Sequence, residues 1–360
     1  MDDSVNHYIS ASFPGNRINI YLDFSTLSET SRKRRILLSD DECLEKGKRQ
    51  DAKMESDNVI TETRFILSGL THHRKEQILL FVVFFIIYLL TVLGNLLIIV
   101  LVWIDTQLHT PMYFFLTHLA GMEILYVTSS SPQLLSHLMA GNGIISVTRC
   151  MLQGDSALCM GSTECLLLGV MAYDRYLAIC NPLRYASAMD SKQQYLLASS
   201  CWVIGCLFSM VNVVCISRHP FCGPNRINHF VCELQFLLDL ACGDIKHTKI
   251  ILNSLATFIV LIPFTIILCS YTCILYSVFQ MHSAASWRKA FSTCGSHLIV
   301  VTLFYGTIIS IYILPQSNTI SDRDKQIAVL YVVITPLLNP IIYTLRNKDV
   351  HRAVVKVLKR

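Results

Sequence analysis

The chain of 360 residues is too apolar and too sparingly charged for a soluble globular protein, with 52% hydrophobic residues, 15% charged residues and a mean hydropathy of +0.47. Several membrane spans would produce this composition directly. The formal net charge is only +5 and the basic residues are spread over many loops, so no nucleic-acid partner is expected.

Residues 1–57 are polar, mixed in charge and without the apolar core of a signal peptide. We predict that they form a disordered extracellular extension. Their basic run at 32–35 is either a targeting signal or, as is commoner, part of a solvated tail. The segment from Met54 onward has the appearance of a short N-terminus of its own, so residues 1–53 are interpreted as an upstream extension.

Seven apolar stretches follow, each long enough to cross a hydrocarbon core of about 30 Å as a helix. They cover residues 78–103, 112–139, 150–178, 195–216, 250–279, 290–314 and 326–345. The predicted fold is therefore all-α, a seven-transmembrane helix bundle over residues 58–345. The apolar spacing in the basic tail, 346–360, predicts a short amphipathic helix on the membrane surface.

The distribution of basic residues predicts the orientation. Those in the short loops after spans three and five and in the tail share one side, which is assigned as cytoplasmic, with the N-terminus outside. Arg74, Lys75 and the basic residues of loop 217–249 depart from this pattern. Four cysteines in polar sequence suggest disulfides, and they favour the same orientation because disulfides persist on the oxidising, extracellular side of the membrane. They are Cys150, Cys222, Cys232 and Cys242, and they allow three pairings.

Five sequence blocks, in this order and on these spans, make the chain from about residue 54 to 350 resemble an odorant receptor of the rhodopsin-like G-protein-coupled class. The blocks are PMYFFL at 111–116, MAYDRYLAIC at 171–180, SY at 270–271, KAFSTCGSH at 289–297 and PLLNPIIY at 336–343. The chain departs from the family in that no Asn-X-Ser/Thr sequon occurs in it.

The resemblance implies a switch at the inner end of span three. There Asp174 would restrain Arg175 in the resting state, and Arg175 would face the G protein once the inner ends of the spans separate. The switch set is Asp174, Arg175, Tyr176, Tyr271, Asn339, Pro340 and Tyr343. Pro340 weakens the backbone of span seven locally, because proline removes a helical hydrogen bond. The alternative is that the acid and base only mark where the helix leaves the lipid.

The resemblance also places the ligand between the outer halves of spans three, five, six and seven. The residues there are Ala157, Leu158, Gly161 and Ser162 in span three, Leu255 and Ile259 in span five, and Tyr305, Ile308, Ile309 and Tyr312 in span six. This mostly apolar lining suits a small neutral volatile held by burial at about 25 cal/mol per Å² and a hydrogen bond or two. About a third of these side chains would only pack helix on helix. Asp155 is expected at the surface.

The resemblance further implies disulfides Cys150–Cys232 and Cys222–Cys242. Glu123 and Glu164 lie at matching depths in spans two and three, roughly 16 to 18 Å from the inner ends at about 1.5 Å per residue. Two bare carboxylates would repel each other there, so we expect them to share a cation, sodium. The alternative is a pair of neutral acids bonded to hydroxyls such as those of Ser129 or Thr163.

The resulting interpretation is a multi-pass plasma-membrane receptor that binds an odorant, contacts membrane lipid, and activates a heterotrimeric stimulatory G protein to raise cyclic AMP. No cofactor is expected other than the sodium ion. A transporter is disfavoured because seven spans do not divide into equal halves and no internal repeat is found. An enzyme is disfavoured because neither an H-E-x-x-H motif nor a P-loop occurs.

Overall fold

The computed structural model describes residues 10–13, 16–19, 64–222, 225–280, 284–312, 322–346 and 348–358, and the side chains of 64–222, 225–280, 294–310, 325–344 and 349–356. The chain divides into two units, Met1–Ile60 and Thr61–Arg360. In the first unit, β1 (Ser10–Phe13) and β2 (Asn16–Asn19) pair in an antiparallel hairpin. The rest of the segment predicted to be disordered, 1–57, lies outside the described residues.

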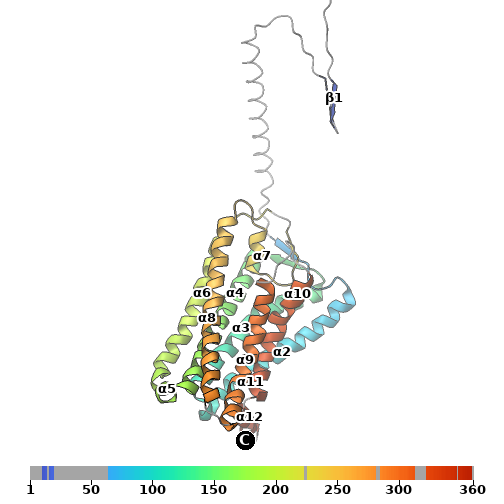
Figure 1. Ribbon diagram of the computed structural model, residues 1–360. Coiled ribbons are helices and arrows are strands. Elements are labelled where there is room, and N and C mark those ends of the chain that lie inside the picture. Colours follow the sequence, from blue (N-terminus) through green and yellow to red (C-terminus); the bar gives the residue numbers. More distant parts are fainter. Residues whose placement is uncertain are drawn as a thin grey trace, which may run out of the picture. The chain divides into compact units, whose positions relative to one another are not determined.

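Seven long helical segments make up most of the described part of the second unit, and each falls on a predicted span. They are α2 (Arg74–Ile104), α3 (Pro111–Ala140), α4 (Val147–Cys180), α6 (Ser191–Ser217), α8 (Lys246–Gln280), α9 (Ala284–Tyr312), and a seventh built from α10 (Asp322–Val329), the π-helix η2 (Leu330–Ile334) and α11 (Thr335–Arg346). They run alongside one another, with the short helices α5 (Pro182–Ala188) and α12 (Lys348–Leu358) at one end and α7 (Leu234–Asp239) at the other (Figure 1).

Among the described residues, five helices are long and apolar enough to cross a membrane, and they correspond to α2, α4, α6, α8 and the seventh segment. The apolar part of α9, Cys294–Ser310, is shorter. α3 has the length, 30 residues, but carries polar side chains such as Glu123 and His137, which are 3% and 7% exposed and so face protein rather than lipid. The predicted all-α seven-helix membrane bundle is confirmed, while the side on which each terminus lies stays a prediction.

Local sequence explains where the helices begin and end. Ser146 precedes α4 and its hydroxyl accepts a hydrogen bond from the Arg149 backbone N–H at 3.3 Å. Asp190 caps α6 in the same way through the Gln193 N–H at 2.8 Å. α3 ends at Gly141, whose φ of +70° is the left-handed conformation that glycine adopts without strain.

Arg74, one of the residues that disturb the charge pattern, has a structural role at the start of α2. Its guanidinium donates to the backbone carbonyls of Leu138 at 3.1 Å and Met139 at 2.7 Å, in the last turn of α3. A cation there satisfies carbonyl groups that the helix leaves unpaired. A basic residue at this end of α2 is therefore explained by helix capping.

A small sheet at the α7 end was not anticipated by the sequence. β3 (Arg64–Leu67) lies between β4 (Ile144–Ser146), to which it is antiparallel, and β5 (Arg226–Ile227), to which it is parallel. Phe65 and Ile227 are 1% and 2% exposed within the apolar cluster of this end. The sheet ties the segment before α2 to two loops that are distant in sequence.

Gly143→Ala should destabilise the protein by about 1–3 kcal/mol, as overpacking of a close contact does. A Cβ at Gly143 would stand 1.9 Å from the Leu67 carbonyl oxygen, and the two backbones are held together because the Leu67 N–H donates to the Gly143 carbonyl at 2.8 Å. Thermal melting of the purified receptor should show a lower midpoint. The matched control is Gly121→Ala, where the added Cβ meets nothing within 4 Å. Equal melting temperatures for the two variants would contradict the close contact.

The predicted amphipathic tail helix forms as α12. Val350 and Ala353 are each 1% exposed on its inner face. The Lys356 ammonium lies 3.1 Å from the Asp105 carboxylate, which also accepts from the Gln107 backbone N–H at the start of the 3-10 helix η1 (Thr106–Leu108). The tail helix is thus joined to the loop between the first two spans.

Candidate ligand and coupling sites

The acid and base of the DR pair at the end of α4 are both buried, at 1% and 8% exposure for Asp174 and Arg175. Asp174 accepts a hydrogen bond from the Tyr185 hydroxyl of α5 at 2.9 Å. Asp174 and Arg175 interact electrostatically, although no ion pair within 4.0 Å joins them among the described residues, so the restraint of Arg175 by Asp174 stays a prediction. Tyr185, which belongs to none of the five sequence blocks, thus holds the acid from the adjacent short helix.

Tyr185 lies outside the spans, and its pKa is raised by burial and by the negative charge of Asp174. The phenol therefore keeps its proton at physiological pH. A protonated phenol can donate to the Asp174 carboxylate throughout that range, which makes the contact insensitive to modest pH changes.

The aromatic members of the switch set surround this end of α4. The Tyr271 hydroxyl of α8 lies 2.7 Å from His297 Nδ1 of α9, and both side chains are buried. The Tyr343 hydroxyl of α11 is buried and has no hydrogen-bond partner among the described residues. Tyr271 and Tyr343 are both within electrostatic reach of Arg175. His297 belongs to the KAFSTCGSH block but was given no role by the sequence analysis.

Two further members of the switch set, Tyr176 and Pro340, make packing contacts. Tyr176 is half-buried and stacks on Tyr173, with ring centroids 6.3 Å apart. Pro340 lies inside α11 and approaches Gly94 so closely that a Cβ there would stand 3.2 Å from the proline ring. The close approach of α2 to α11 is therefore made at a glycine and a proline.

The buried acid Glu123 and the half-buried acid Glu164 meet around Asn339. Its side-chain amide donates to the Glu123 carboxylate, and Glu164 interacts electrostatically with Glu123 and with the same asparagine. The hydroxyls named as alternative partners are engaged elsewhere, since Ser129 donates to Tyr126 O and Thr163 to Cys159 O, both at 2.8 Å.

The donor set around the acids fits a cation that prefers oxygen ligands. One carboxylate oxygen of Glu164 and the side-chain oxygen of Asn339 are buried without a hydrogen-bond partner among the described residues. Carboxylate and amide oxygens suit hard cations such as sodium. Within the described part of the chain, no group of three or more His, Cys, Asp or Glu side chains could hold a metal ion, so any cation here relies on the asparagine.

The predicted ligand residues divide into several environments. Ala157, Leu158, Gly161 and Ile259 are half-buried, as are Ile308 and Ile309. A Cβ at Gly161 would meet nothing within 4 Å, so this position of α4 borders open space. Tyr305 is 2% exposed and its hydroxyl lies 3.1 Å from Cys165 Sγ. The side chain of Tyr312 lies outside the described residues.

Two of these residues are placed away from the space between the helices. The Ser162 hydroxyl donates to the Leu158 carbonyl and lies 3.5 Å from the Gly205 carbonyl, so it faces α6. Leu255 is 36% exposed on α8. Asp155, expected at the surface, is half-buried and accepts from the Ser209 hydroxyl of α6. Periodicity could not reveal these directions, since each depends on how one helix is turned relative to its neighbours.

A small cavity lies elsewhere in the bundle, between α2, α3 and η2. Its lining includes Tyr88, Thr91, Val127, Ser131 and Val333, and none of the predicted ligand residues contributes to it. No sequence motif pointed to it.

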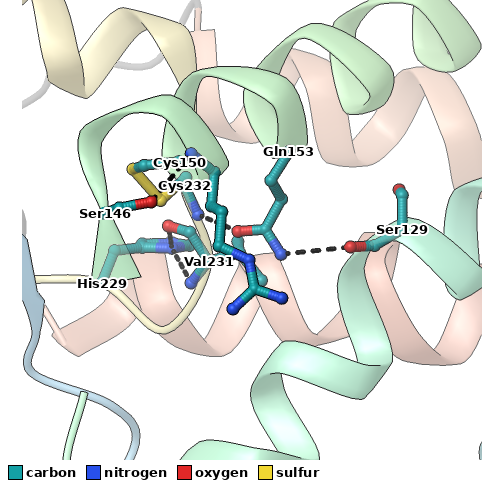
Figure 2. The surroundings of a disulfide bond; sticks show 8 residues. Ser129, Ser146, Cys150, Gln153, His229, Val231 and Cys232 are labelled. Carbon is teal, nitrogen blue, oxygen red and sulfur yellow. Dashed lines mark hydrogen bonds between the residues drawn. A yellow bond between two sulfur atoms is a disulfide. The ribbon is translucent and has the colours of Figure 1, made fainter. Parts of the chain in front are cut away.

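The cysteines of the outer loop are joined in the two pairs that the resemblance implies, Cys150–Cys232 and Cys222–Cys242. Figure 2 shows Gln153, one turn after Cys150, beside the first bridge. Its carbonyl oxygen accepts from the Cys232 N–H at 2.9 Å and its amide donates to Ser129 O at 3.4 Å. Gln153 thus fastens the loop to α4 and to α3 beside the disulfide.

The same loop also contacts the seventh segment through a half-buried acid, Glu233, to which no sequence motif pointed. Glu233 accepts a hydrogen bond from the Tyr331 hydroxyl of η2, and its carboxylate lies 3.8 Å from His229 Nε2. The loop after α6 is therefore attached to spans two, three and seven. Its position directly after Cys232 was the only sequence signal for Glu233.

Comparison with known proteins agrees with this architecture. The family model described as olfactory receptor matches residues 84–360. Human olfactory receptor 10C1 is 46% identical over 85% of this chain and 98% of its own length. Human olfactory receptor 13D1 is 44% identical over 85% and 89%, and mouse olfactory receptor 2C1 is 42% identical over 85% and 98%. The chain therefore belongs to the olfactory receptor family, whose members are multi-pass plasma-membrane receptors for odorants that act through G proteins and are not enzymes.

Proposed function

We propose that this olfactory receptor detects a small, mostly apolar volatile and activates a stimulatory G protein, so that cyclic AMP rises. The observation that supports the ligand class best is the environment of Gly161. Open space borders this glycine, and Ala157 and Leu158, which precede it by four and three residues on the same face of α4, are apolar and half-buried. A ligand of this kind would be stabilised mainly by burial, at about 25 cal/mol per Å².

Tyr305 supplies the polar group of the proposed site. It packs against Phe264 with ring centroids 4.9 Å apart and bonds Cys165 through its hydroxyl. The same hydroxyl donates a long hydrogen bond, 3.4 Å, to the Cys165 carbonyl oxygen. Because one of these contacts is to a sulfur and the other is long, the phenol can exchange either for a bond to a ligand oxygen at small cost. This favours volatiles with a single carbonyl or hydroxyl group.

Coupling to the G protein would begin at the tyrosine and histidine layer beside Arg175. A ligand that binds better when the inner ends of the helices are apart shifts the population toward that state, by as much as its affinity differs between the two. In the opened state Tyr271 and Tyr343 would contact Arg175, at the expense of the bond from Tyr271 to His297. The tail helix α12 would lie on the lipid surface with its charged side chains toward water.

This function is tested by applying a panel of volatiles to cells that express the full chain together with a cyclic AMP reporter. At least one small neutral odorant should evoke a rise that cells without the receptor do not show. A response through calcium alone, blocked when a G protein of another class is inhibited, would refute the stimulatory assignment while leaving the receptor role intact.

The buried acids support a further part of the proposal, a sodium ion held by Glu123, Glu164 and Asn339. The cation would supply positive charge that offsets two carboxylates in a low-dielectric interior. If it stabilises the resting state, raising sodium at constant ionic strength should weaken agonist potency.

Glu123→Gln should remove this sodium dependence, because the variant loses one of the two carboxylates. The measurement is agonist potency at low and high sodium, with a bulky cation replacing sodium. Glu76→Gln, at an exposed position of α2, is the matched control and should keep the dependence. An unmodified receptor whose potency is independent of sodium would contradict the site.

A further inference from the structure

Two free cysteines face each other across the contact of α4 with α6, inside the bundle. Cys159 Sγ and Cys206 Sγ are 2.9 Å apart, although the residues are 47 apart in sequence. Cys159 is 7% exposed and Cys206 is half-buried. Neither belongs to the outer-loop disulfides, and the proposed ligand and coupling sites use neither thiol.

Close contacts between α4 and α6 lie on either side of the cysteine pair. One residue before Cys206, Gly205 packs so tightly against α4 that a Cβ would lie 2.1 Å from the Thr163 hydroxyl and 3.0 Å from its backbone nitrogen. About one turn after Gly205, the Ser209 hydroxyl of α6 donates to the Asp155 carbonyl at 2.8 Å. The register of α4 against α6 is therefore set at these points, and the cysteine pair lies between them.

The distance favours a covalent bond between the sulfurs over a shared metal ion. Two sulfurs on a tetrahedral zinc ion, each about 2.3 Å from the metal, stand roughly 3.8 Å apart. A disulfide requires about 2.05 Å, which the pair reaches by closing less than about 1 Å. Small rotations of two cysteine side chains supply such a movement. Among the described residues, no third His, Cys, Asp or Glu completes a metal set at this place.

We propose that Cys159 and Cys206 form a redox-sensitive pair that closes into a disulfide within the membrane and joins span three to span four. The oxidant class is a small uncharged hydroperoxide that enters the membrane, such as hydrogen peroxide. The bond anchors the outer half of α4, which carries Ala157, Leu158 and Gly161, to α6. This proposal rests on the helix contact and does not depend on the ligand or the G protein.

Oxidation of the two thiols to a disulfide takes two balanced steps. One thiol gives up its proton and its sulfur attacks a peroxide oxygen, so the O–O bond breaks, an S–O bond forms and one water leaves. The second thiol gives up its proton and attacks that sulfur, so the S–O bond breaks, the S–S bond forms and a second water leaves. The two sulfurs lose two electrons, which reduce one hydrogen peroxide to two waters.

Peptide mapping of the full chain in native membranes tests the pair. Membranes are treated with hydrogen peroxide or buffer, free thiols are blocked with N-ethylmaleimide during denaturation, and the chain is digested with trypsin without reduction. Cleavage at arginine and lysine yields 193–218, with Cys206, and 150–175, with Cys159, which the Cys150–Cys232 bond keeps joined to 227–246 in treated and untreated samples alike. We expect these two peptides to be joined after peroxide, with the loss of two hydrogen atoms, and fragment ions to locate the bond between Cys159 and Cys206.

Neighbouring cysteines on the same two peptides provide matched controls. Cys159→Ala and Cys206→Ala should each abolish the link, while Cys165→Ala and Cys201→Ala should retain it. Recovery of both thiols as maleimide adducts from peroxide-treated, unmodified receptor would overturn the proposal, as would a link located at Cys165, Cys201 or Cys215. Because the decisive map uses the unmodified chain, poor folding of a variant does not obscure the answer.

Discussion

Arg175→Ala should reduce the agonist-evoked cyclic AMP rise to the basal level while leaving surface expression largely intact. Arg175 lies at the α5 end of α4, 14 residues and about four turns from Gly161, so its side chain cannot touch a ligand bound there. In the opened state it is the basic group that the G protein and the tyrosines Tyr271 and Tyr343 would contact. Its loss removes interactions made only in the active state, so signalling fails without loss of the fold.

Surface labelling and cyclic AMP are measured in the same cells to test this result. Arg184→Ala, at an exposed position of α5, is the control for charge removal at the same end and should signal nearly as well as the unmodified receptor. An Arg175→Ala receptor that reaches the surface and responds normally would refute the coupling role. A variant that fails to reach the surface would instead assign the buried guanidinium to folding.

Cys150→Ser and Cys232→Ser should each destabilise the receptor by about 2–5 kcal/mol, enough to remove most of it from the cell surface. The bond links residues that are 82 positions apart in sequence, and Cys150 and Cys232 are 0% and 1% exposed. Its loss also frees the loop segment that bonds Gln153 and Tyr331. Surface expression and the thermal midpoint of the solubilised receptor are the measurements.

A double-mutant cycle identifies the pairing. If the two cysteines are bonded to each other, the double variant should be no less stable than either single variant, because the second change removes nothing further. Cys215→Ser, at a half-buried free cysteine of α6, should have a small effect. Additive losses from the two single variants, or recovery of Cys150 bonded to Cys222 or Cys242, would contradict the pairing.

The sequence alone determined the spans, because a bilayer imposes their length and apolar character. The predicted span 78–103 became Arg74–Ile104, and 250–279 became Lys246–Gln280. The helices extend a few residues beyond the apolar stretches, since polar caps such as Ser146 and Asp190 lie outside them. The amphipathic tail was predictable for the same reason, as its spacing places Val350 and Ala353 on one face.

Only the tertiary structure decided which side chains meet. Ser162 and Gly161 are adjacent in sequence, yet Ser162 bonds toward α6 and Gly161 borders open space, because successive helical residues point about 100° apart. Tyr185 on Asp174, Glu233 on Tyr331 and Asn339 on Glu123 join residues from separate helices or loops, and no local pattern encodes such pairs. The three-stranded sheet was likewise hidden, since strands of two to four residues carry too few alternating positions to be distinguished from loop.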